Sequence, residues 1–326
     1  MSGGQDASLI LRIAGRRLAV VGDRQLTAVR PAFAGIIEAA GSAMQSGPVL
    51  RIVEAADPSA LPAWSSLPSG CHRGRGGMLS VIRRNPSSVE LYLPGPDPLL
   101  RLDASPAALA SGDLRAQPAH HALAAWLSGP TLQMVHAGAV AKDGRGVLFI
   151  GVGGRGKTTT ALSCARAGYQ FLGDDLCLVE CGAPDRSTRP RVHGLYATAK
   201  LNADSRQRLE AADWPTLGVT PSGKTAVALP QTIEFGRSAQ LVAIVSLSTN
   251  QNGPLQPRHI PPRAAIHLLG STALPLASGS GLPRDWLSTT AALLRDVPVF
   301  ELGLNWDFER VTSAIGQLLS RPTDLA

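Results

Sequence analysis

Residues Gly151 to Thr158 constrain the fold of this 326-residue chain more than any other stretch. They follow the pattern G-x-x-x-x-G-K-[ST], in which glycine N–H groups surround a polyphosphate, the lysine adds positive charge and the hydroxyl can bind Mg²⁺. The apolar run from Gly146 to Ile150 is typical of a buried strand, and residues 158–167 favour a helix closed by Gly168. The alternative is a glycine-rich turn that happens to contain a lysine, but such a turn does not require a buried strand before it and a helix after it. We therefore expect a strand, a phosphate-binding loop and a helix in that order.

The candidate ligands for phosphate lie within this loop and the first turn of the helix. Lysine suits the phosphate position because its ammonium is compact, and only four of the 31 basic residues are lysines. Thr158 is the candidate hydroxyl ligand of Mg²⁺. The predicted nucleotide-binding residues are Gly151, Gly153, Gly154, Arg155, Gly156, Lys157, Thr158 and Thr159.

An acidic pair is expected to return to the same loop. Ten helical residues carry the chain about 15 Å away, and a strand over Tyr169 to Gly173 carries it about 16 Å back. Asp174 and Asp175 then lie at the loop, where carboxylates suit Mg²⁺ binding and proton transfer; a solvated turn is the alternative. Neighbours on a strand point to opposite faces, so only one of the two is expected to face an acceptor.

His136 is a further candidate, placed by counting along a predicted hairpin. Asp143-Gly144 is typical of a two-residue turn that pairs Lys142 with Arg145. Counting back along that register puts His136 opposite Gly151. A lone histidine is as often a structural residue, so both interpretations remain open.

The loop pattern occurs a second time, from Gly218 to Thr225. No buried strand precedes this copy, and the run from Ala226 to Leu229 after it predicts a strand stopped by Pro230. We interpret it as a turn. The alternative is that Lys224 reaches the same nucleotide from a neighbouring loop.

These residues resemble those of a known family. His136-Ala137-Gly138-Ala139-Val140, the loop, and Gly173-Asp174-Asp175 are similar to the HPr kinase/phosphorylase group and its shorter bacterial relatives, which share a fold with ATP-dependent phosphoenolpyruvate carboxykinase. The resemblance implies ATP and Mg²⁺ as cofactors. It also implies Asp174 as the base that deprotonates an acceptor serine, His136 and Lys157 as further catalytic residues, and Thr158 and Asp175 at the metal.

The specific part of the resemblance covers residues 131–200. The family's second signature contains a metal-binding glutamate, but Arg191 to Tyr196 contains no carboxylate, so a second metal ion and phosphorolysis are not implied. The stretch before Lys200 looks like the shorter relatives, some of which resemble kinases of lasso-peptide precursors. The implied partner is a protein or peptide with an acceptor serine.

Composition narrows the class of protein. The formal charge is +7, but charged residues make up 17% and aromatic residues 4% of the chain, without the basic stripe that nucleic-acid binding needs. We expect no nucleic-acid partner and, without an apolar run of about 18 residues, no membrane span. The four cysteines form no zinc or disulfide pattern, which favours free thiols and a cytoplasmic location. A homo-oligomer is possible.

The predicted fold is α/β: a P-loop domain of the HPr kinase/phosphoenolpyruvate carboxykinase type with a mixed sheet, preceded by a smaller β-rich domain. We place the boundary near residue 130, giving 1–130 of unknown role and 131–326 as the kinase domain. Hairpins are predicted over 8–23, with a turn at Gly15-Arg16, and over 78–93. Ala226–Leu229, Ile233–Phe235 and Leu241–Leu247 are predicted as strands of one sheet, and 263–269 as a helix that lies over the site.

Three functions are compatible with these residues. The leading one is an ATP-dependent kinase that phosphorylates a serine hydroxyl on a protein or peptide. A nucleotide-binding regulatory module without transfer activity would keep the loop but lack the chemistry. A small-molecule kinase or a carboxykinase-like enzyme is the third, although the chain is short for the latter.

Overall fold

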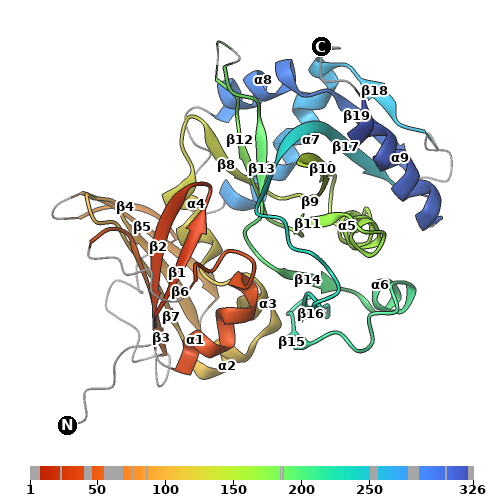
Figure 1. Ribbon diagram of the computed structural model, residues 1–326. Helices are drawn as coiled ribbons and strands as arrows, with labels where there is room; N and C mark the ends of the chain where they lie inside the picture. The colour runs from red at the N-terminus through yellow and green to blue at the C-terminus, as the bar shows by residue number, and fades with distance from the viewer. Residues whose placement is uncertain are drawn as a thin grey trace, which may run out of the picture.

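The computed structural model describes residues 8–22, 24–39, 46–54, 69–74, 77–85, 87–183, 185, 187–249, 256–277, 286–304 and 307–321. It is a mixed α/β structure with three sheets (Figure 1). No helix among these residues has both the length and the apolar character needed to cross a membrane.

The first sheet is built by the amino-terminal part of the chain. Its seven strands lie in the order β1-β2-β3-β7-β6-β5-β4, parallel at β2–β3 and β3–β7 and antiparallel elsewhere. Both predicted hairpins are confirmed, but the first turn is Ala14-Gly15 rather than Gly15-Arg16, because both residues adopt positive φ as a two-residue turn requires. The strands are β1 (Ser8–Ile13), β2 (Arg16–Val21), β3 (Val49–Glu54), β4 (Gly70–Gly74), β5 (Gly77–Asn85), β6 (Ser88–Leu93) and β7 (Leu99–Ala104).

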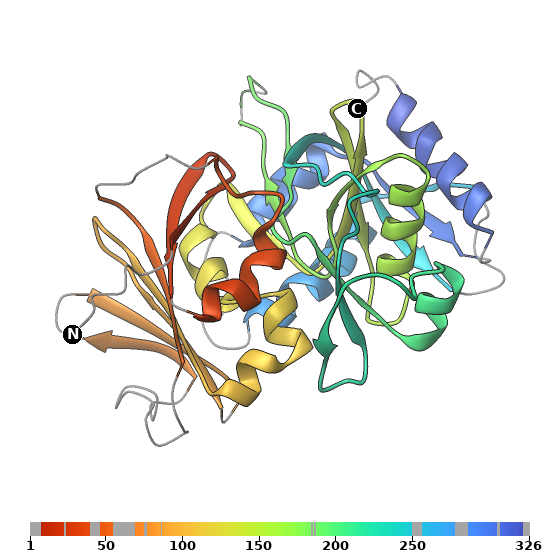
Figure 2. The same ribbon diagram turned by 60° about the horizontal axis from the view of Figure 1, so that its bottom comes forward.

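Short helices cover this sheet on the side that faces the rest of the molecule (Figure 2). They are α1 (Arg24–Val29), the 3-10 helix η1 (Arg30–Phe33), α2 (Pro106–Ala110), α3 (Gly112–Ala116) and α4 (His120–Leu127). Ser105 and Ser111 cap α2 and α3 by accepting hydrogen bonds from the Ala108 and Leu114 N–H groups. These caps fix the direction of the chain at α2 and α3, close to Asp113 and Gln117.

The second sheet is mixed and holds the glycine-rich loop. Its main path is β11-β9-β10-β17-β13-β12-β8, with β19 beside β17 and β18 beside β19. β10 and β19 run parallel to β17, and the other pairs are antiparallel. The strands are β8 (Leu132–Val135), β9 (Gly138–Lys142), β10 (Arg145–Ile150), β11 (Gln170–Gly173), β12 (Cys177–Glu180), β13 (Arg191–His193), β17 (Ser238–Ser248), β18 (Arg258–Ile260) and β19 (Val299–Gly303).

Helices cover both faces of this sheet, and the alternation along β10 shows why. Val147 and Phe149 pack with α5 (Lys157–Arg166) and α9 (Phe308–Ser320), whereas Leu148 and Ile150 pack with α7 (Pro262–Ala277) and α8 (Trp286–Asp296). A strand that is buried on both faces is continuously apolar, as this one is. The helix predicted over 263–269 is therefore present as part of α7, but it packs against the sheet and does not lie over the site.

A small third sheet lies beside the second. It contains β14 (Thr198–Leu201), β16 (Thr225–Ala228) and β15 (Thr216–Val219), and α6 (Ala203–Arg208) follows β14. The prediction of one sheet for residues 226–247 is wrong, because β16 pairs with β14 and β15 while β17 joins the large sheet. Ile233–Phe235 is not a strand; Phe235 forms a single bridge with Phe171.

Packing continues across the predicted boundary near residue 130. One buried cluster joins the first sheet and its helices to β8, β12 and Tyr196. The Tyr196 side chain is fully buried, and its hydroxyl donates a hydrogen bond to Pro118 O at 2.7 Å. The boundary itself stays a prediction, but the two sides share a core.

Candidate active site at a glycine-rich loop

The predicted strand, loop and helix are β10, residues 151–156 and α5. Gly151, Gly154 and Gly156 have φ of 138°, 79° and 82°, which is the region that favours glycine. A Cβ on Gly156 would come within 2.5 Å of Leu304 Cδ1, whereas nothing lies within 4 Å of a Cβ built on Gly153 or Gly154. The loop is thus packed at its base and open at its tip, ahead of the first turn of α5.

Lys157 opens α5 and is 5% exposed. Its Nζ donates hydrogen bonds to Gly151 O (2.7 Å) and Val152 O (3.4 Å), the carbonyls of its own loop. Burial lowers the pKa of this ammonium, although Asp175 and Asp174 act in the opposite direction. Within the described residues no carboxylate forms an ion pair with Nζ, so its charge is directed at the open loop.

Asp174 lies directly after β11 and is 1% exposed. Its two carboxylate oxygens accept hydrogen bonds from different elements: Oδ1 from Thr158 Oγ1 at 2.6 Å, and Oδ2 from the Lys200 N–H at 3.1 Å. Burial, together with the charge of Asp175, raises the pKa of Asp174 to about 6. The sequence prediction that the acidic pair returns to the loop is confirmed at this contact.

Asp175 has a left-handed backbone (φ 64°), and its side chain lines a cavity next to the loop, whereas that of Asp174 does not. Its carboxylate lies 3.2 Å from Lys200 Nζ and 3.8 Å from His136 Nε2. Burial acts to raise the pKa of Asp175, but the charges of Lys200, His136 and Lys224 outweigh it and hold the pKa below its usual value. Asp175 is therefore an ionised carboxylate at neutral pH.

His136 lies between β8 and β9, and its side chain lines the cavity. The hairpin register that placed it there is confirmed, since Lys142 pairs with Arg145, and the ladder ends at Gly138 opposite Phe149. Burial is the largest effect on the pKa of His136 and lowers it, which favours the neutral ring.

Lys157, Asp175 and His136 line one cavity of about 320 Å³, whereas the buried Asp174 is not part of its lining and contacts it through Thr158. Three of the four lysines of this arginine-rich chain line it: Lys157, Lys200 and Lys224. The second loop is a turn, as the sequence predicted, and it joins β15 to β16 as a hairpin closed by the Gly223 N–H to Thr220 O at 2.9 Å. It also carries Lys224 to the cavity.

Two predicted nucleotide ligands lie outside the cavity lining. Gly151 forms the base of the loop, and Arg155 Nη1 donates a weak hydrogen bond to Thr249 Oγ1 at 3.4 Å. The other predicted residues of the loop and helix, from Gly153 to Thr159, line it, and Thr159 Oγ1 also contacts Ser205 Oγ at 2.9 Å.

The amino-terminal part of the chain contributes contacts that the sequence did not indicate. Asp113 Oδ1 lies 2.9 Å from Lys200 Nζ, which places this lysine between Asp113 and Asp175. Gln117 Nε2 donates a hydrogen bond to Asp174 O at 3.3 Å. Both residues are far from the loop in sequence and belong to no recognisable pattern.

Comparisons with known proteins show a weak likeness to solved structures. No family model matches the chain, and no curated protein matches it. Among solved structures, the HPr(Ser) kinase/phosphatase from Coxiella burnetii is similar at 14% identity and a TM-score of 0.32, over 57% of this chain and 95% of that one.

Proposed function

We propose that this chain is an ATP- and Mg²⁺-dependent kinase that transfers a phosphoryl group to a serine hydroxyl on a protein or peptide. One observation carries the proposal: the Thr158–Asp174 hydrogen bond fixes one buried carboxylate behind a hydroxyl of the lysine-lined cavity, while Asp175 lines that cavity directly. A carboxylate at the metal side and another at the acceptor side are the parts that phosphoryl transfer needs. The choice of serine follows the sequence resemblance.

The cavity has the features of a polyphosphate site. The open tip of the loop leaves room at Gly153 and Gly154, and the loop N–H groups precede a ten-residue helix. Lys157, Lys200 and Lys224 add three positive charges, with Asp175 and Asp204 as acidic residues of the lining. This balance fits the triphosphate of ATP.

The residues at Thr158 fit a magnesium site. Among the described residues, no group of three or more histidine, cysteine or acidic side chains could hold a metal ion by itself. Mg²⁺ is commonly held by one or two protein ligands plus substrate phosphates, so the Thr158 hydroxyl, oriented by its hydrogen bond to Asp174, would be sufficient together with those phosphates. When bound, Mg²⁺ neutralises charge on the transferred phosphates.

The geometry supports a different division of roles between the aspartates than the resemblance implies. The resemblance gives Asp174 as the base and Asp175 as a metal ligand. Asp174 is instead bonded to Thr158, as expected for the aspartate that shares Mg²⁺ with the loop hydroxyl, and Asp175 faces the cavity. We therefore place Asp174 at the metal and Asp175 at the acceptor hydroxyl, where an ionised carboxylate orients the hydroxyl and accepts its proton.

Phosphorylation of defined acceptors tests the proposal. The purified chain is incubated with γ-labelled ATP and Mg²⁺ together with a peptide library of fixed serine, a matched library with alanine at that position, and small alcohols. Label in the serine library alone is the expected result. Nucleotide binding without transfer would indicate a regulatory module, and label in the alcohols would indicate a small-molecule kinase.

A further inference from the structure

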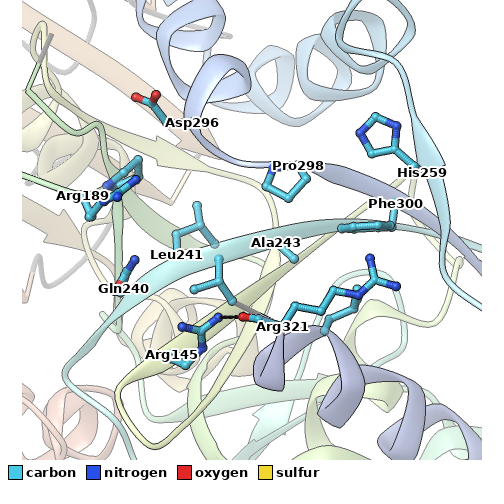
Figure 3. Close-up of a pocket in the computed structure, with 13 residues that line it drawn as sticks. Arg145, Arg189, Gln240, Leu241, Ala243, His259, Asp296, Pro298, Phe300 and Arg321 are labelled. Atoms are coloured by element: carbon cyan, nitrogen blue, oxygen red, sulfur yellow. Dashed lines mark hydrogen bonds between the residues drawn. The ribbon is translucent and has the colours of Figure 1, made fainter. Parts of the chain in front are cut away.

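A second cavity lies at the opposite end of the large sheet from the glycine-rich loop. Figure 3 shows the residues that line it. Its volume is about 330 Å³, and it is lined by the amino-terminal ends of the parallel strands β10, β17 and β19. Arg145 begins β10, whereas Gly151 follows its last residue, so about 16–20 Å of strand separates the two cavities. The cavity is independent of the proposed nucleotide site.

One wall of this cavity is apolar. Leu241, Ala243, Pro298 and Phe300 contribute to it, and Figure 3 shows them between Arg189 with Gln240 on one side and Arg321 with His259 on the other. A volume of this size with an apolar wall and a few polar groups at its edge is typical of a small-molecule site.

The charges at this cavity are mostly positive. The Arg145 guanidinium is bonded to the carboxyl end of α9: its Nε and Nη2 donate hydrogen bonds to Leu319 O and Arg321 O, each at 2.5 Å. The Arg321 guanidinium lies 4.9 Å from the centre of the Phe300 ring, and Arg189 is exposed. Asp296 is the acidic residue in the described lining, so arginine charge exceeds carboxylate charge by two, three minus one.

We propose that this cavity binds a small amphipathic carboxylate. The apolar body of the ligand lies against the wall formed by Leu241, Ala243, Pro298 and Phe300, and its carboxylate points toward Arg189 or Arg321. A guanidinium is the side chain that best matches a planar carboxylate, since it presents parallel N–H donors. The volume restricts the body to about the size of a substituted benzene ring. The inference does not depend on the proposed kinase activity.

Ligand-observed fluorine NMR tests the inference with two probes of the same shape. These are 4-(trifluoromethyl)benzoate and its neutral analogue 4-(trifluoromethyl)benzyl alcohol, each titrated against the full chain. We expect the benzoate to bind about tenfold more tightly, because only its charge meets the arginines. Saturating ATP and Mg²⁺ should leave benzoate binding unchanged. Equal binding of the two probes, or displacement by ATP, would overturn the inference.

Charge variants locate the benzoate. The double variant Arg189→Gln/Arg321→Gln should lose the preference for benzoate while retaining the weak binding of the alcohol, which shows that the cavity is intact. The control is Arg295→Gln/Arg310→Gln, which removes the same charge from α8 and α9 outside the cavity lining. If the control loses the preference equally, or if Arg189→Gln/Arg321→Gln keeps it, benzoate binds elsewhere and the proposal is wrong.

Discussion

Two loops of this chain share the pattern G-x-x-x-x-G-K-[ST], yet the structure builds them differently. Residues 151–158 run from β10 into α5, whereas residues 218–225 form a hairpin turn between β15 and β16. The two copies differ in the segment that follows: the run of small residues after Thr158 forms a ten-residue helix, whereas the short apolar run after Thr225 forms a strand and is stopped by Pro230. The pattern of letters alone therefore does not fix the local structure.

The two loops nevertheless bring their lysines to one cavity, in different states. Lys157 is buried and bonded to loop carbonyls at the start of a helix. Lys224 is half-buried at the end of a turn that is held by Thr220, whose hydroxyl accepts the Lys224 N–H at 3.1 Å. At the proposed nucleotide site we therefore expect Lys157 to provide the main phosphate contact and Lys224 a secondary one.

The largest effect is expected for Lys157→Ala. Loss of a buried ammonium directed at the phosphates should weaken ATP–Mg²⁺ binding by about 100-fold, measured by isothermal titration calorimetry. Lys142→Ala is the matched control, because Lys142 is exposed on β9 and outside the cavity. Unchanged affinity in Lys157→Ala would remove this loop from the nucleotide site.

Lys224→Ala should have a smaller effect on the same measurement, about tenfold, because its contact is single and partly solvated. A loss as large as that of Lys157→Ala would reverse the order of the two loops. No loss at all would leave Lys224 as a residue of the turn only.

Asp174→Asn should stabilise the nucleotide-free protein at pH 7.5. The folded-state pKa of about 6 lies above the unfolded value, so burying the ionised carboxylate costs stability, and this cost appears as pH rises through the window from 3.8 to about 6. We expect the free energy of unfolding to rise by about 1 kcal/mol at pH 7.5. This figure allows for the weaker hydrogen bond that the Lys200 N–H makes to an amide than to a carboxylate. The gain should shrink at pH 5.0.

Thermal unfolding with EDTA present measures this gain. The control is Asp143→Asn, in which an exposed turn residue with a left-handed backbone is replaced by one that tolerates the same conformation. A loss of stability in Asp174→Asn at pH 7.5 would show that the hydrogen bonds to the carboxylate outweigh its burial.

Asp113→Asn tests whether the amino-terminal part of the chain supports the site, and the smallest effect is expected here. Without the Asp113 charge, the ion-pair partner that Lys200 keeps among the described residues is Asp175, so ATP–Mg²⁺ affinity should fall by about threefold. Asp97→Asn, an exposed site elsewhere in the first 130 residues, is the control. Identical affinities would show that the contact of Asp113 with Lys200 does not support the nucleotide site.

Local chemistry explains which parts could be predicted. The strand, loop and helix, the turn at Asp143-Gly144 and the return of Asp174 to Thr158 follow from spacing along a short stretch of chain. The left-handed backbone of Asp175 could not be predicted from this spacing. The alternation of side chains along a strand puts Asp174 and Asp175 on opposite faces, but it does not tell which of the two faces the cavity.

Contacts across long stretches of sequence could not be predicted. Asp113 reaches Lys200 over 87 residues, and Tyr196 reaches Pro118 over 78, through packing that no single segment encodes. The assignment of β16 to its own small sheet has the same cause, since a short apolar strand does not indicate by its own sequence which strand it pairs with.

Magnesium-dependent ATP binding in Asp174→Asn and Asp175→Asn tests the central claim most directly. Calorimetry with and without Mg²⁺ should show that Asp174→Asn loses most of the gain in affinity that Mg²⁺ gives the parent. Asp175→Asn should keep that gain within a few-fold, while phosphoryl transfer falls by about 100-fold. The opposite pattern, with the magnesium effect lost in Asp175→Asn and retained in Asp174→Asn, would contradict the placement of Asp174 at the metal and Asp175 at the acceptor.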